Sequence, residues 1–222
     1  MLVLGLEAST FMNSVAVTQN GELKGQFLIN QAKSKKNNLI QLMDYILKSA
    51  NVNGRELDGI SVSIGPGSYT GLRISLSIAK SLAFCWEKPL TVVNSLDALA
   101  QHGRNQNKLI CPLIRFRSNE YFYAFFTLSN SKVERQSEYF TNTLDDIVKD
   151  LKQPVYFVGL LRKEDKDKLS SLMNNGRDYV LSNSFPEARW IALLGELNLK
   201  QGIKEDIQHV TPYYMHDFPI KN

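Results

Sequence analysis

Apolar and polar residues alternate along the first thirty positions, and apolar residues then recur at helical spacing. Alternation over residues 2–7, 14–18 and 23–29 predicts three strands, and Asn20-Gly21 between the last two is a hairpin signal. Apolar side chains three and four positions apart then predict a helix over residues 39–50. Further along, the expected elements are a strand at 60–64, a helix at 74–84, a strand at 90–93 and a short helix at 95–101. We predict the element order βββαβαβα for residues 1–103.

The second half of the chain repeats this order after a polar stretch at residues 103–108. Its expected elements are strands at 109–114, 121–128 and 133–140, a helix at 144–151, a strand at 155–158, a helix at 163–173, a strand at 179–181 and a helix at 186–200. Two such units in tandem are typical of actin/Hsp70-like (ASKHA, ribonuclease H-like) α/β proteins, in which each lobe is a mixed sheet covered by helices. We therefore expect a first lobe at residues 1–103 and a second at 104–222, with the C-terminal helix and tail able to pack back on the first.

A glycine-rich loop joins the strand at 60–64 to the helix that follows; it consists of Gly65, Pro66, Gly67, Ser68, Tyr69, Thr70 and Gly71. Glycine permits positive φ and the close approach of another backbone, and the free amides of a helix's first turn can hold an anion. The spacing fits neither common phosphate loop: five residues rather than four separate Gly65 from Gly71, no Lys-Ser/Thr pair follows, and the dinucleotide fingerprint is missed by one residue. A helix-entry turn without a ligand is as well supported as a binding loop.

The helix after this loop carries more apolar surface than one neighbour can cover. Leu72, Leu76 and Ala79 form one stripe, and Ile78 and Leu82 lie on a second stripe beside it. Contact with a partner protein is one interpretation, and a helix enclosed within its own domain is the other. On the first interpretation, the partner interface combines this helix with the helix at 39–50 and contains Leu39, Leu42, Met43, Ile46, Leu72, Arg73, Leu76, Ile78, Ala79 and Leu82.

Composition narrows the class of protein only modestly. The chain has 222 residues, of which 43% are hydrophobic, and a net charge of +4; these values suit an ordinary globular protein and permit, without requiring, a role near RNA. Cys85 and Cys111 are isolated from each other and from histidine, so we expect buried thiols in a reducing compartment. The chain starts without a basic leader and has no apolar run of 18 residues, so we expect a cytoplasmic protein with no membrane span.

Candidate chemistry is sparse. Nucleotide-using members of the superfamily carry an acid for the metal and a glycine for the phosphate in their first hairpin, so Glu7, Ser9 and Thr10 are the candidates for a residual nucleotide contact. Ala8 stands in the place of that glycine, and an acid that only caps the turn is equally consistent with the sequence. No two histidines have zinc-site spacing, and no base lies near Ser68 or either cysteine in the sequence. We expect no catalytic residue, no metal site and no cofactor required by this chain.

Three segments carry a resemblance to a known family. They are residues 2–10 (LVLGLEAST), residues 61–74 (SVSIGPGSYTGLRI) with 79–83 (AKSLA), and residues 93–100 (VNSLDALA). Over about residues 1–101, the chain resembles the bacterial TsaB (YeaZ) family, the non-peptidase glycoprotease homologues that take part in making threonylcarbamoyladenosine in tRNA. The second half resembles the family less, since Arg115-Phe116-Arg117 stands where members usually have Asp-Ala-Arg.

The resemblance implies a non-catalytic scaffold subunit. It would pair with the catalytic paralogue TsaD and the ATPase TsaE in transferring a threonylcarbamoyl group to the adenosine next to the anticodon. ATP and metal would be used by those partners, tRNA would be met through the complex, and the isolated chain could form a homodimer. The alternative from another class is a free-standing ATP-dependent kinase of the sugar-kinase kind, for which Asp145-Asp146 is the only candidate acid pair in the second half.

Overall fold

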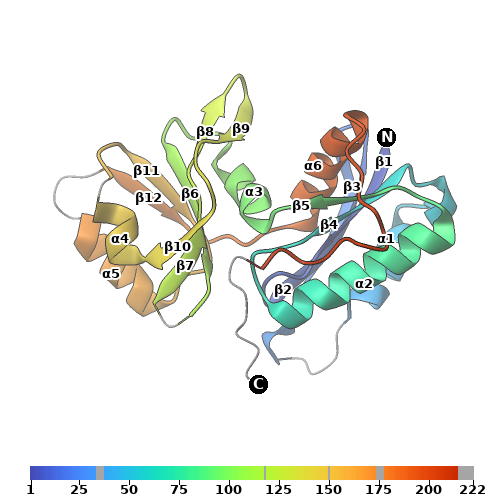
Figure 1. The fold of residues 1–222 in the computed structure, drawn as a ribbon, viewed down its shortest axis with the longest axis horizontal. Helices are drawn as coiled ribbons and strands as arrows, with labels where there is room; N and C mark the ends of the chain where they lie inside the picture. The colour runs from blue at the N-terminus through green and yellow to red at the C-terminus, as the bar shows by residue number, and fades with distance from the viewer. Residues whose placement is uncertain (34–37, 118, 150, 174–177, 215–222) are drawn as a thin grey trace. The chain divides into compact units, whose positions relative to one another are not determined.

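The structure is a computed structural model that describes residues 1–33, 38–117, 119–149, 151–173 and 178–214 (Figure 1). The chain forms two compact units, one made of Met1–Ala98 with Pro186–Tyr213 and the other of Leu99–Phe185 with Tyr214. We expected a division at residues 103/104, with the last helix counted in the second lobe. The segment 186–213 belongs to the first unit, because its helix packs on the first sheet, which is the packing that the expectation for the C-terminal helix allowed. The expected tail, residues 215–222, lies outside the described residues.

The first unit contains a five-stranded mixed sheet in the order β3-β2-β1-β4-β5. Its strands are β1 (Leu2–Glu7), β2 (Met12–Gln19), β3 (Glu22–Asn30), β4 (Gly59–Ser63) and β5 (Leu90–Val93). The β1, β2 and β3 strands pair antiparallel, whereas β1, β4 and β5 pair parallel. Asn20 and Gly21 both have positive φ, at 54° and 83°, as the predicted hairpin turn between β2 and β3 requires.

Helices cover both faces of this sheet (Figure 1). Leu4 and Leu6 of β1 point into a core shared with α1 (Leu39–Ser49) and α2 (Tyr69–Trp86). Gly5, between them, faces the opposite side, where an added Cβ would meet the backbone and Cβ of α6 (Ala188–Lys200). The period-two alternation of β1 therefore places α1 and α2 on one face and α6 on the other. Shorter helices of the first unit are η1 (Gln31–Lys33) and η2 (Gly54–Glu56); α3 (Ser95–Ala100) crosses the boundary between the units, and η3 (Gln101–Gly103) belongs to the second unit.

The second unit is also built on a mixed sheet, with β10-β7-β6-β11-β12 as its main path and with β8 and β9 attached to β6. The elements are β6 (Leu109–Arg115), β7 (Glu120–Tyr123), β8 (Phe126–Ser129), β9 (Lys132–Arg135), β10 (Phe140–Thr143), α4 (Leu144–Lys149), β11 (Val155–Val158), α5 (Lys163–Met173) and β12 (Tyr179–Ser182). Two α/β units, each with a mixed sheet and helices, confirm the predicted fold class.

Two expected strands of the second unit are each divided in the structure. The strand predicted at 121–128 is β7 followed by β8, and the strand predicted at 133–140 is β9 followed by β10. The chain changes partners at the break, since β7 pairs with β10 whereas β8 pairs with β9. At the break, the Phe125 amide donates to Ser137 Oγ at 2.9 Å, and the Gln136 amide donates to the Phe125 carbonyl at 2.8 Å. These bonds satisfy backbone groups that the ladders leave free.

Candidate functional site

The glycine loop connects the end of β4 to α2, as the sequence predicts, but the helix begins at Tyr69 rather than at residue 74, so that Tyr69, Thr70 and Gly71 form its first turn. Ser68 is the N-cap of α2, and its Oγ accepts a hydrogen bond from the Gly71 amide at 3.2 Å. The Ser68 amide donates to the carbonyl oxygen of Ser9, in the first hairpin turn, at 2.6 Å. The loop is thus attached both to its own helix and to the turn between β1 and β2.

Two glycines allow this loop to pack directly on the hairpin turn. A Cβ added to Gly67 would collide with the Ser9 carbonyl, and one added to Gly71 would collide with the Ala8 carbonyl. The close approach that glycine permits is therefore made to the chain's own backbone. Of the two interpretations of the loop, these contacts favour the helix-entry turn.

Glu7, at the end of β1, lies beneath this turn and is fully buried. Its Oε1 accepts a hydrogen bond from the Ser9 amide at 2.5 Å, whereas its Oε2 finds no hydrogen-bond partner among the described residues. Burial raises the pKa of Glu7 above its ordinary value. The Ser9 and Ser63 hydroxyls lie close enough to offset part of this increase, although neither makes a hydrogen bond of ordinary geometry to the carboxyl. The environment therefore favours the neutral acid, which is a poor ligand for a metal ion.

The other two candidates for a nucleotide contact differ in accessibility. Ser9 is buried, whereas Thr10 is half-buried and its Oγ1 accepts a hydrogen bond from the Met12 amide at 3.2 Å. Across the described parts of the chain, no group of three His, Cys, Asp or Glu side chains could hold a metal ion. Glu7 Oε1 and Thr10 Oγ1 thus accept amides of the hairpin's own turn.

Seven of the ten expected partner residues are buried in the core of the first unit. They are Leu39, Leu42, Met43, Ile46, Leu72, Leu76 and Ala79. Their side chains pack on the sheet, so they cannot form a partner surface in this fold. Ile78 and Leu82 are half-buried at the edge of the same core, and Arg73 is exposed with its guanidinium 4.0 Å from the centre of the Tyr69 ring.

The exposed side of α2 carries a different set of residues, which we call the outer face of α2. It consists of Arg73, Ser77, Ser81, Phe84 and Cys85, bordered by Ile78 and Leu82. Phe84 is 77% exposed, the highest value among the large apolar residues of the described chain. On the neighbouring α1, Ile40 and Tyr45 are 57% and 59% exposed. Sequence reasoning missed Phe84, although its position four residues after Lys80 already placed it on the polar line of the helix.

The remaining candidate residues take part in local contacts. Asp145 pairs with Lys168, which lowers the pKa of its carboxyl, and Asp146 accepts a hydrogen bond from Thr143 Oγ1 at 2.7 Å. His209 pairs with Asp206 at 2.6 Å, and His216 lies outside the described residues. The Asp145-Asp146 pair is therefore engaged in surface contacts of α4.

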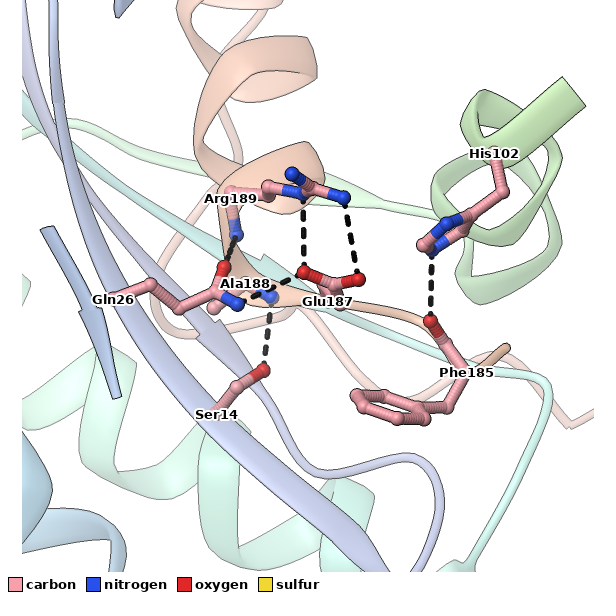
Figure 2. A network of polar contacts seen from close by, with 7 residues as sticks. All are labelled: Ser14, Gln26, His102, Phe185, Glu187, Ala188 and Arg189. Carbon is pink, nitrogen blue, oxygen red and sulfur yellow. Dashed lines mark hydrogen bonds and ion pairs between the residues drawn. The ribbon is translucent and has the colours of Figure 1, made fainter. Parts of the chain in front are cut away.

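A polar network that the sequence does not reveal attaches the start of α6 to the first sheet (Figure 2). The Ala188 amide donates to Ser14 Oγ at 2.9 Å, and the Arg189 amide donates to Gln26 Oε1 at 3.0 Å. Gln26 Nε2 also donates to Glu187 Oε2 at 2.8 Å, and Glu187 forms an ion pair with the Arg189 guanidinium. Side chains of β2 and β3 thus occupy amides that a helix leaves free in its first turn. Figure 2 also shows a contact within the second unit, in which His102 Nε2 lies 3.2 Å from the Phe185 carbonyl oxygen.

No helix in the described residues is long and apolar enough to span a membrane. Cys111 is buried as expected, but Cys85 is exposed, because it lies on the outer face of α2 rather than in the core. Burial raises the pKa of the Cys111 thiol.

Two α/β units with this topology define a two-lobed protein of the actin/Hsp70-like class. A family model described as "TsaD: tRNA N6-adenosine threonylcarbamoyltransferase" matches residues 26–210. The chain belongs to this family, and its full-length likeness is to TsaB (YeaZ) members.

Three relatives support this placement. The chain is 24% identical over 220 residues to the tRNA threonylcarbamoyladenosine biosynthesis protein TsaB of Bacillus subtilis, over 97% of this chain and 94% of that protein. It is 31% identical over 114 residues to the tRNA N6-adenosine threonylcarbamoyltransferase of Persephonella marina, but over only 44% of this chain and 33% of that enzyme. The solved structure of YeaZ from Pseudomonas aeruginosa matches with a TM-score of 0.79 at 20% identity, over 96% of this chain and 99% of that one. The chain thus has the length of TsaB and spans about a third of the transferase.

Proposed function

We propose that this protein is a non-catalytic scaffold subunit in the biosynthesis of threonylcarbamoyladenosine in tRNA. Full-length likeness to TsaB supports a role in that process. The finer assignment is that the protein pairs with TsaD and with the ATPase TsaE during threonylcarbamoyl transfer to the adenosine next to the anticodon. ATP and metal are then used by those partners, tRNA is met through the complex, and the site of action is the cytoplasm.

The burial of Glu7 is the observation that carries the non-catalytic part of the proposal. A carboxyl that holds a metal-bound nucleotide must be ionised and must face the ligand. Glu7 is fully buried, its pKa is raised, and one of its oxygens is already bonded to the Ser9 amide. Gly67 and Gly71 fill the space above the turn with the chain's own backbone.

The outer face of α2 supports the subunit part of the proposal. Phe84 is a large aromatic side chain exposed beside half-buried Ile78 and Leu82, and Arg73 lies at the other end of the same face. Aromatic residues and arginine are enriched in the central parts of protein interfaces. We assign this face, with the exposed side of α1, to TsaD, and to a second copy of the chain when TsaD is absent.

An activity assay with purified components tests this function. We expect the chain alone to show neither ATP hydrolysis nor tRNA threonylcarbamoylation, and we expect modification to need this chain when TsaD and TsaE of the same organism are supplied. Steady ATP turnover by the chain alone, abolished by Glu7→Ala but not by Glu22→Ala at an exposed acid of β3, would contradict the proposal.

A further inference from the structure

The chain after α6 runs over the surface of the first unit without forming a helix or strand. We call residues 203–213 the C-terminal strap; in Figure 1 it is the red trace that leaves α6 and passes α2. Near its start, the Glu205 amide donates to the Leu90 carbonyl of β5 at 2.8 Å. At its end, the Tyr213 amide donates to the carbonyl of Ile64, just after β4, at 2.8 Å. The strap therefore reaches the glycine loop from the edge strand of the sheet.

One lysine of α2 holds the middle of the strap. Lys80 Nζ donates to the carbonyl oxygens of Gln208 and Val210, at 3.3 Å and 3.1 Å. An ammonium group has three donors, and hydrogen bonds with a charged partner are stronger than those between neutral groups. Lys80 thus fixes two carbonyl groups, one within and one just after the turn at residues 207–209, in a segment that has no helix or strand of its own.

The strap buries few apolar side chains. Ile207 and Val210 are half-buried against the core of the first unit, and most of the remaining strap side chains are exposed. Segments with few buried apolar contacts and exposed backbone open locally at low free-energy cost, well before the domain unfolds. The strap belongs to this low-stability class, whereas the sheet beneath it does not.

Contacts continue from the strap through the glycine loop to the first hairpin. The Tyr213 carbonyl oxygen lies so near Gly65 that an added Cβ would be 2.9 Å from it. Gly65 begins the loop whose Ser68 amide bonds to the Ser9 carbonyl at 2.6 Å. The glycine loop is therefore packed between the end of the strap on one side and the hairpin turn above Glu7 on the other.

We propose that the C-terminal strap acts as a latch: it reversibly holds the glycine loop against the first hairpin turn. The hydrogen bonds of Lys80 keep the strap in its closed position. When the strap opens, the bond between Tyr213 and Ile64 is lost, and the loop loses the contact that presses it onto Ser9. The C-terminal end of the first unit is in this way coupled to the turn that covers Glu7. This device goes beyond the scaffold role and does not depend on which partner the protein has.

Residue-resolved amide hydrogen exchange on the full chain tests the latch. Lys80→Met keeps the apolar stem of the lysine and removes its donors, so we expect exchange at the Tyr213 and Ser68 amides to quicken roughly tenfold, while α6 amides are unchanged. Lys80→Arg retains charge and donors and should keep most of the protection. Lys48→Met, at an exposed lysine of α1, is the matched control and should leave both amides at their wild-type rates.

Two outcomes would overturn the proposal. If Tyr213 exchanges faster in Lys80→Met but Ser68 does not, the strap opens without affecting the loop. If neither amide changes its exchange rate, Lys80 does not hold the strap closed. Should Lys80→Met fail to fold, Tyr213→Pro removes the donor to Ile64 together with the Tyr213 side chain, and the same roughly tenfold increase is expected at Ser68; an unchanged Ser68 rate in that variant counts equally against the latch.

Discussion

Helices α2 and α6 cover opposite faces of the same sheet and are packed in different ways. The α6 helix lies so close to the strands that glycines replace side chains at the contact: Gly5 lies under Ala188 and Ala192, and Gly195 lies over Ser61. The α2 helix buries the larger Leu72 and Leu76 beside smaller residues, and leaves Phe84 on its outer face. The helix with the wider apolar stripe, α2, is therefore the one that leaves apolar surface exposed. Close packing is instead marked by small residues at positions 188, 192 and 195 of α6, an i, i+4, i+7 line.

The difference in packing between α2 and α6 can be tested by placing the same side chain on both helices. Leucine at Gly195 would collide with Ser61, and overpacking of this kind costs roughly 3 kcal/mol at the upper end of its usual range. We expect Gly195→Leu to lower the free energy of unfolding by about that amount. Ser77→Leu, on the exposed side of α2, should change it by no more than about 0.5 kcal/mol. Urea denaturation followed by circular dichroism measures both, and equal losses would contradict the account.

A charge on each helix tests which one meets a partner. Phe84→Glu removes an aromatic side chain from the outer face of α2, and losing its burial should weaken TsaD binding by about 2 kcal/mol, roughly 30-fold in Kd. Leu197→Glu, at a 47% exposed position of α6, is the matched control and should bind like the wild type. Isothermal titration calorimetry measures the binding of both variants. If Leu197→Glu bound TsaD more weakly while Phe84→Glu bound it normally, the interface would lie on the α6 side of the sheet.

The attachment of α6 can be tested at its first turn. Ser14→Ala removes the acceptor of the Ala188 amide, which then lies buried without a partner. We expect a loss of about 1–2 kcal/mol in the free energy of unfolding. Ser77→Ala, at an exposed serine of α2, should be within about 0.5 kcal/mol of the wild type. If thermal and chemical denaturation show no difference between the two variants, the network in Figure 2 does not hold the helix.

The buried acid beneath the hairpin predicts a dependence on pH. Because the folded-state pKa of Glu7 lies above its ordinary value of 4.5, the folded protein binds this proton more tightly than the unfolded chain does. Well below pH 4.5, Glu7 is protonated in both the folded and the unfolded state. Above pH 4.5, the free energy of unfolding of the wild type relative to Glu7→Gln should fall as the pH rises, by up to about 1.4 kcal/mol per pH unit. The fall should end once the pH has passed the folded-state pKa. Denaturant midpoints of the two proteins between pH 4 and 8 measure this; a constant difference would mean that the pKa of Glu7 is not raised by folding.

Local features of the first unit could be read from the sequence. Asn20-Gly21 fixes its hairpin through positive φ, whereas the start of α2 was expected at residue 74 although Ser68 caps it by a contact only three residues long. The partner residues could not be assigned so easily, since two apolar stripes on one helix do not reveal which of them faces the sheet. The bonds that hold α6 join Ala188 to Ser14 and Arg189 to Gln26 across 174 and 163 positions, so no local pattern reveals them. Because these contacts are so distant in sequence, the position of α6 near the C-terminus suggested that the helix belonged to the second lobe.

The exposed cysteine of α2 permits a direct test of the central claim, that the outer face of this helix is the partner surface. Cys85 is exposed on that face and Cys111 is buried in the second unit, so a thiol-alkylating reagent should modify Cys85 alone in the native chain. The measurement is the rate of Cys85 alkylation with and without saturating TsaD, followed by mass spectrometry. We predict at least tenfold slower modification of Cys85 in the complex. A complex that forms while Cys85 reacts as fast as in the free chain would contradict the claim.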